Sequence, residues 1–163
     1  NEYIKLMGLI YPEYSALAPT HRWGLLLVGV VMMMVLAPNS LGVNGYSIKY
    51  IFPYAIYNSD VVLVYRLTGT VNGNDLWEFL PETHYFADGT RNFSYNFDFT
   101  KNDVQIYLEG NNLGTLDAAY RLNQIFRIVV VPADIIYGID KNNYPAVMNA
   151  LKINESQVQK INF

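Results

Sequence analysis

The chain has 163 residues, the length of one domain with room for a short appendage. It carries 11 Lys and Arg residues against 14 Asp and Glu residues, a net charge of −3, and no basic cluster. Nucleic-acid binding depends on neutralising phosphates, so this charge pattern argues against a nucleic-acid partner. The chain has no cysteine, which excludes disulfides, thiolate metal sites and cysteine nucleophiles.

Residues 24–37 form an uncharged apolar run near the start of the sequence. As a helix, about 14 residues cover roughly 21 Å, which is well short of the hydrocarbon thickness of a bilayer. A signal-peptide core, a membrane-associated segment and a buried strand all fit a run of this length. Of these we expect the strand, over residues 26–37, paired antiparallel with residues 46–52.

Apolar alternation predicts strands from residue 46 to residue 131. Residues 61–67 and 124–131 are almost continuously apolar, which is typical of central strands buried on both faces, and Pro132 ends the second run. Tight turns are expected at residues 72–73 and 88–89, where Asn-Gly and Asp-Gly occur. Residues 92–100 alternate without a break, which predicts Phe93, Tyr95, Phe97 and Phe99 in the core and Asn92, Ser94, Asn96 and Asp98 in water.

Short strands at this spacing predict an all-β protein, an antiparallel β-sandwich of Ig-like or jelly-roll-like type with a short C-terminal helix. Pro145 is well placed for the first turn of that helix. We expect three parts: an N-terminal segment over residues 1–43, the sandwich domain over residues 44–135, and a helical appendage over residues 136–163.

Four stretches carry a resemblance to a known family: residues 58–66 (NSDVVLVYR), 77–83 (WEFLPET), 97–104 (FDFTKNDV) and 123–134 (NQIFRIVVVPAD). Over residues 58–134 the chain resembles a family of uncharacterised cell-surface proteins of Bacteroidota, typically exported lipoproteins with a small β domain. The resemblance implies export, a surface or outer-membrane-associated location and no assigned activity. Residues 1–43 do not match the signal, lipobox cysteine and polar spacer with which members usually begin.

Oxygen donors gather at one predicted turn, where Asp98, Asn102 and Asp103 are weak candidates for a calcium site. Turns use the same residue types for local hydrogen bonds, and we prefer this second interpretation. His84 lies near Glu82 in the sequence, but the only other histidine is His21, and the two give no metal-ligand spacing. We therefore expect a loop histidine without a metal, and no cofactor.

Trp77 and Tyr107 are the weak candidates for ligand binding, because an exposed aromatic ring stacks on a sugar, although core packing explains them equally well. The sequence contains no nucleophile motif and no phosphate-binding loop. We expect no enzyme but an exported cell-surface structural or protein-interaction module that binds a protein partner or itself. The alternatives are a carbohydrate- or ligand-binding β-sandwich, and a small subunit of an envelope complex that associates with the membrane through residues 24–37.

Overall fold

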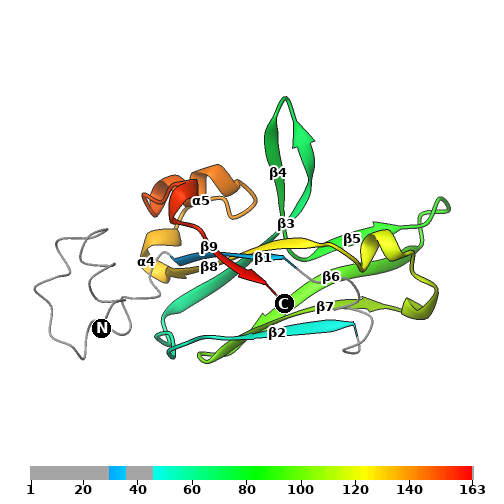
Figure 1. The fold of residues 1–163 in the computed structure, drawn as a ribbon, viewed down its shortest axis with the longest axis horizontal. Helices are drawn as coiled ribbons and strands as arrows, with labels where there is room; N and C mark the ends of the chain where they lie inside the picture. Colours follow the sequence, from blue (N-terminus) through cyan, green and yellow to red (C-terminus); the bar gives the residue numbers. More distant parts are fainter. Residues whose placement is uncertain (1–29, 36–45, 163) are drawn as a thin grey trace, which may run out of the picture.

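The computed structural model of this chain describes residues 30–35 and 46–162. Two β-sheets pack face to face, and short helices lie near the C-terminal end of the chain (Figure 1). Sheet A has the strand order β4-β3-β8-β1-β9, and sheet B has the order β2-β7-β6-β5. Neighbouring strands are antiparallel except β1 and β9, which are parallel. The structure therefore confirms the predicted sandwich with a short C-terminal helix.

The bounds of the elements follow chain order. The strands are β1 (Val30–Val35), β2 (Ser47–Ile51), β3 (Asp60–Val71), β4 (Asn74–Phe79), β5 (Glu82–Tyr85), β6 (Arg91–Phe99), β7 (Asp103–Gly110), β8 (Ile125–Pro132) and β9 (Gln159–Asn162). The helices are α4 (Ala133–Ile136) and α5 (Tyr144–Ala150), with the 3-10 turns η2 (Leu113–Thr115), η3 (Ala118–Tyr120) and η4 (Glu155–Gln157).

Sheet A is covered on both faces, which explains why β3 and β8 are almost continuously apolar. Alternate residues of these strands, such as Val64 and Ile128, lie in a core between the two sheets. The residues between them, such as Leu63 and Val129, lie in a second core on the outer face of sheet A. Helix α5 covers this outer core with the buried side chains of Tyr144, Val147 and Met148. The prediction that both strands are buried is confirmed.

The aromatic strand β6 has the predicted register but not the full predicted pattern of exposure. Phe93 and Tyr95 are buried in the core between the sheets, as expected. Phe99 is 40% exposed, because it ends the strand beyond the core. Ser94 is only 3% exposed, because Thr83 of β5 and the Arg91 side chain both contact its hydroxyl group. Periodicity alone therefore placed Ser94 and Phe99 wrongly.

The apolar run near the start of the sequence does form a strand, β1, over six of the expected residues. Its expected partner was wrong: β1 pairs antiparallel with β8 and parallel with β9, whereas β2 pairs with β7 in the other sheet. An apolar strand needs a neighbour on each side, and sheet A supplies both from the C-terminal half of the chain. Residues 24–29 and 36–37 lie outside the described residues, so membrane association through this run stays a prediction.

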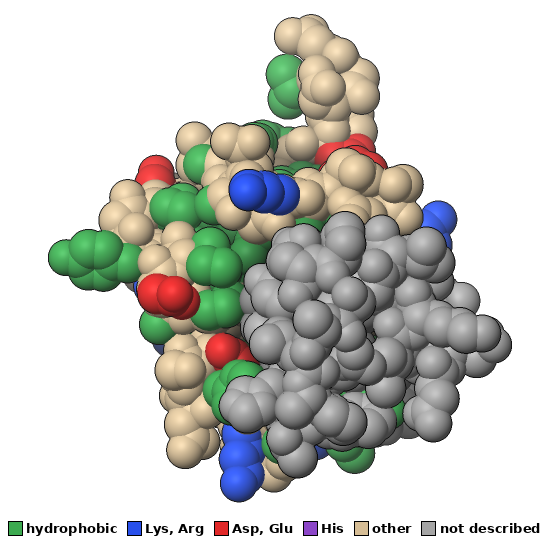
Figure 2. Space-filling view, turned by 90° about the vertical axis from the view of Figure 1, so that its left-hand side faces the viewer, with side chains coloured by type: hydrophobic (Ala, Val, Ile, Leu, Met, Phe, Trp, Pro, Cys, Tyr) green, Lys and Arg blue, Asp and Glu red, His purple; other side chains and the backbone are tan. Residues whose placement is uncertain are grey.

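Strands β3 and β4 form a hairpin that rises out of the two layers (Figures 1 and 2). Its turn is at Asn72-Gly73, as predicted, and both residues have positive φ angles, 52° and 79°. The pairing of β3 with β8 ends at Arg66, so β3 continues beyond the sheet with β4 as its described neighbour. Trp77 lies on β4, near the base of this projecting hairpin.

Two features of the C-terminal part of the chain place α5 and the loop before it against sheet A. Asn143 caps α5, since its side chain accepts a hydrogen bond from the backbone N–H of Ala146, and Pro145 lies in the first turn as predicted. After α5 the chain returns to sheet A as β9, beside β1.

Within the described part of the chain, no helix has both the length and the apolar character needed to cross a membrane.

Candidate functional site

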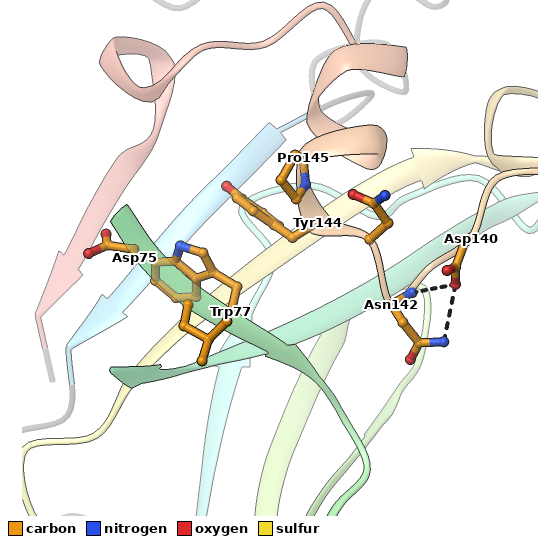
Figure 3. Close-up of a pocket in the computed structure, with 8 residues that line it drawn as sticks. Asp75, Trp77, Asp140, Asn142, Tyr144 and Pro145 are labelled. Atoms are coloured by element: carbon orange, nitrogen blue, oxygen red, sulfur yellow. Dashed lines mark hydrogen bonds between the residues drawn. The ribbon is translucent and has the colours of Figure 1, made fainter. Parts of the chain in front are cut away.

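A pocket of about 390 Å³ lies between β4 and the loop that leads into α5. Figure 3 shows the side chains that line it, with the Trp77 ring beside the Tyr144 ring at the start of α5. The ring centres of Trp77 and Tyr144 are 5.6 Å apart, with the ring planes tilted by 41°. The residues that line the pocket are Asp75, Leu76, Trp77, Asp140, Asn142, Asn143, Tyr144 and Pro145.

Local structure fixes both walls of the pocket. On one wall, Trp77 pairs with Leu67 in the β3–β4 ladder, so the backbone of the hairpin holds its ring. On the other wall, Asp140 accepts two hydrogen bonds from Asn142, one from the backbone N–H at 3.0 Å and one from the side-chain amide at 3.1 Å. This turn leads directly into the capped first turn of α5, which carries Tyr144.

Arg127 of β8 holds the two aromatic rings in place. Its guanidinium carbon lies 4.0 Å from the centre of the Trp77 ring and 5.1 Å from that of Tyr144. The same group donates a hydrogen bond to the Tyr144 hydroxyl group and pairs with both carboxylate oxygens of Glu155. Arg127 is 3% exposed, and its Nε is a buried nitrogen without a hydrogen-bond partner among the described residues. The cation–π contact with Trp77 offsets part of the free-energy cost of this missing hydrogen bond.

Burial changes the pKa values of two tyrosine hydroxyl groups at the pocket. Burial raises the pKa of the Tyr144 hydroxyl group to about 12, Arg127 opposes that rise, and the carboxylates of Glu155 and Asp75 add to it. Burial also raises the pKa of Tyr65, with smaller contributions from Tyr144 and Asp140. Tyr65 donates a hydrogen bond of 2.7 Å to the backbone oxygen of Lys141, which anchors the loop that lines the pocket. Both tyrosines are therefore neutral at physiological pH.

The two aromatic residues named from the sequence lie on opposite faces of the sandwich. Trp77 packs against the outer core of sheet A and lines the pocket. Tyr107 lies on the outer face of sheet B, because its neighbours Ile106 and Leu108 both point into the core between the sheets. In the ladder it stands between Ser47 of β2 and Asn96 of β6. The structure does not bring Trp77 and Tyr107 together.

The oxygen donors considered for calcium are engaged in the turn between β6 and β7. Asp103 accepts a hydrogen bond of 2.8 Å from the Thr100 hydroxyl group and pairs with Lys49 at 3.3 Å. The Thr100 bond, with smaller help from Lys49, lowers the pKa of Asp103. The backbone N–H of Asn102 bonds to the same hydroxyl group, and Asp98 is exposed on β6. Nowhere in the described residues do three or more His, Cys, Asp or Glu side chains gather as metal ligands would.

A second polar cluster lies against Tyr95 of the core between the sheets. Arg66 of β3 donates two hydrogen bonds of 2.6 Å to the two carboxylate oxygens of Glu82, which is 6% exposed. Its remaining terminal nitrogen bonds to Gln124, whose amide group donates to the backbone oxygens of Ala119 and Leu122. Each polar group in the cluster has a partner, so the cluster ties β3, β5 and the segment before β8 together.

His84 belongs to this cluster and is not the loop residue that the sequence suggested, because it lies in β5. Its Nε2 is 2.7 Å from a Glu82 oxygen, and its ring stacks on Phe93 with 4.5 Å between the ring centres. The carboxylate of Glu82 is already shared with Arg66 and is therefore poorly suited to act as a base. We assign the cluster a role in stability.

Sequence reasoning named Trp77 but missed Arg127, Tyr144 and Asp140. Arg127 had a visible signal, since it is the one charged residue within the apolar run of residues 124–131. A charge in a buried strand needs a partner, and that need points to a polar cluster on one face of the sheet. The position of Tyr144 beside Trp77 depends on how α5 folds back over sheet A, which no local pattern encodes.

Comparison of this chain with protein-family models, with curated proteins and with solved structures found no match.

Proposed function

We propose that this chain is a non-catalytic binding module displayed at the cell surface, and that its binding site is the pocket at Trp77. The surface location rests on the resemblance over residues 58–134 and on a composition rich in tyrosine and poor in charge. The binding site rests on one observation, the pairing of Trp77 and Tyr144 in a pocket that is also lined by carboxylate and amide groups.

A carbohydrate is the ligand class that fits this lining best. The apolar face of a sugar ring packs on an aromatic ring, while its hydroxyl groups need donors and acceptors nearby. Trp77 and Tyr144 offer the aromatic surface, and Asn142, Asn143 and Asp140 offer amide and carboxylate groups from the adjoining loop. The rings are held from behind by Arg127, so the site is formed before a ligand arrives.

The proposal contains no chemical step. A hydrolase needs a nucleophile or an activated water beside a free acid or base. His84 and Glu82, the acid–base pair of the described residues, lie in the stabilising cluster with Arg66 and do not line the pocket. The carboxylates of the pocket, Asp75 and Asp140, are on exposed segments in water.

Ligand-detected NMR against a panel of oligosaccharides tests the binding site. We expect Trp77→Ala to weaken binding of any positive sugar by about tenfold or more, since it removes the stacking surface, and Trp77→Phe to retain part of the affinity. Tyr107→Ala is the matched control, an aromatic residue on the opposite face whose loss should leave binding unchanged. Binding that depends on Tyr107 and not on Trp77 would move the site to sheet B. Far-ultraviolet circular dichroism and the midpoint of urea unfolding check that each variant keeps its fold.

A second candidate, self-association, is favoured by the β3–β4 hairpin, which projects beyond the rest of the described surface (Figure 2). Val71 and Leu76 near its tip are 55% and 50% exposed. Apolar side chains on a projecting ribbon suit insertion against another copy. Analytical ultracentrifugation of the purified chain tests this. A concentration-dependent dimer that Leu76→Ser weakens is expected, and a strictly monomeric chain at about 100 μM would exclude it.

A further inference from the structure

We propose that the Trp77 pocket selects sugars that carry a free, positively charged amino group over neutral or acetylated ones. This inference rests on the proposed function and deepens it by naming the class of sugar. The observation that carries it is the charge of the lining: of the eight residues around the pocket, the charged ones are Asp75 and Asp140, and none is Lys, Arg or His.

The two carboxylates flank the aromatic pair. Figure 3 shows Asp75 on one side of Trp77 and Tyr144, and Asp140 on the other side with its hydrogen bonds to Asn142. Both of these bonds end on Oδ1 of Asp140, which leaves Oδ2 as an acceptor for a ligand within the described structure. Asp75 has no ion-pair partner among the residues that the structure describes.

The cation behind the pocket does not cancel this negative charge. Arg127 is buried beneath the Trp77 ring and is matched by the two carboxylate oxygens of Glu155, so this pair is close to neutral as a unit. The fields of the two aspartates also reach the aromatic residues, because Asp75 contributes to the raised pKa of Tyr144 and Asp140 to that of Tyr65, although burial is the main cause in both. A cation in the pocket would therefore be attracted by the two carboxylates of its lining.

An organic ammonium group fits this arrangement better than a metal ion does. The carboxylates lie on different segments, and the described residues bring no third acid or histidine to either one. Calcium takes six to eight oxygen ligands, which two separated carboxylates do not supply. An ammonium group on a sugar ring instead bonds to one carboxylate while the ring stacks on Trp77, and it gains from the electron-rich aromatic face.

Three disaccharides of matched shape test the inference: a β-1,4-linked glucosamine dimer, its N-acetylated form and the glucose dimer. Isothermal titration at about pH 6, where the amine is protonated, should show the glucosamine dimer binding about tenfold more tightly than the other two. That advantage should shrink as salt rises from about 20 to about 300 mM. Asp75→Asn should weaken the glucosamine dimer by about 3- to 10-fold and leave the neutral dimers unchanged. Asp140→Asn, which also changes an acceptor for sugar hydroxyl groups, should weaken the glucosamine dimer by more than it weakens the neutral dimers. Asp98→Asn, on the opposite face, removes the same charge and is the matched control.

The outcomes separate the two claims. If a neutral dimer binds as tightly as the glucosamine dimer and loses affinity in Trp77→Ala, the selectivity for amines is wrong and the proposed function stands. If none of the three sugars binds and a wider oligosaccharide panel is also negative, both claims fail. If a simple diamine such as putrescine binds as tightly as the glucosamine dimer, the pocket recognises amines without a sugar ring, and the inference is overturned.

Discussion

The guanidinium carbon of Arg127 lies 4.0 Å from the centre of the Trp77 ring, and the same group donates a hydrogen bond to the Tyr144 hydroxyl group. One side chain of β8 thereby holds an aromatic residue of the projecting hairpin and another of α5. These two segments contribute the walls of the pocket. The geometry of the site therefore depends on a charge in the middle of sheet A, behind the surface that a ligand would touch.

Replacing Arg127 should lower the free energy of unfolding by less than its many contacts suggest. Arg127→Met keeps an unbranched chain in the outer core, and it leaves Glu155, which is 68% exposed, in water. We expect the free energy of unfolding to fall by about 1–2 kcal/mol, from the lost stacking and the lost bond to Tyr144. Urea denaturation followed by far-ultraviolet circular dichroism measures it. Arg91→Met, in the exposed pair with Glu109, is the control and should change stability by less than about 1 kcal/mol.

The opposite case is Glu82→Gln, which leaves a buried arginine without its counter-charge. Arg66 has a side chain only 12% exposed, and Glu82 supplies two of its hydrogen bonds. We expect a loss of about 3 kcal/mol, at the low end for a broken buried pair because the amide still accepts one bond. Glu109→Gln is the matched control on the surface, where about 0.5 kcal/mol is expected. Equal losses in the two variants would contradict the assignment of the Arg66 cluster to stability.

The buried tyrosines should make the fold sensitive to alkali. Burial raises the pKa of Tyr144 from 10.0 to about 12, and it raises those of Tyr65 and Tyr95 as well. Above pH 10 the unfolded chain loses these protons while the folded chain keeps them. The free energy of unfolding should therefore fall between pH 10 and about 12, by up to ~1.4 kcal/mol per pH unit for each tyrosine.

Tyr144→Phe separates the contribution of one tyrosine from the rest. Urea midpoints measured across this pH range should fall less steeply in the variant, by the slope that belongs to one proton. Tyr137→Phe removes a hydroxyl group on a residue that is 88% exposed, and it is the matched control. A slope that is the same in Tyr144→Phe and in the unmodified chain would show that this hydroxyl group titrates normally in the folded state.

The turn of the projecting hairpin offers a test of backbone conformation. Gly73 has a φ of 79°, and Gly73→Ala should cost about 1 kcal/mol because a Cβ disfavours that region. Gly69 lies in the same hairpin without a positive φ and with open space around its Cα, so Gly69→Ala is the matched control. Hydrogen exchange of the hairpin amides, which reports local opening, should become about fivefold faster in Gly73→Ala only. Equal acceleration in both variants would contradict the assigned turn.

The sandwich was predictable because its signals are local. Two long apolar runs marked β3 and β8, and Asn-Gly marked the hairpin turn, because each depends on residues close together in the sequence. The partner of β1 was wrong for the opposite reason. Period-two alternation says which face a residue takes and not which strand lies beside it, and β1 found its neighbours about 100 residues further along the chain.

The site was predictable only in part. Trp77 was named as an exposed aromatic residue, yet its significance comes from Tyr144 and Arg127, which reach it from α5 and from β8. Asp140 was not named from the sequence at all. The contacts among these residues depend on a helix that folds back over the outer face of sheet A, and a single sequence contains no local pattern for that placement.

Strand β1 lies between β8 and β9, so an early segment of the chain has both of its neighbours among residues 125–162. During synthesis, the two neighbours of β1 in sheet A are therefore absent until residues 125–162 have left the ribosome. Until then the sequence Val-Val-Met-Met-Met-Val lacks the strands that flank it in the fold. Such a segment is a natural binding site for a holdase chaperone and a starting point for aggregation when release is slow. Of the described strands, β1 is synthesised first and is among the last to pair with its neighbours.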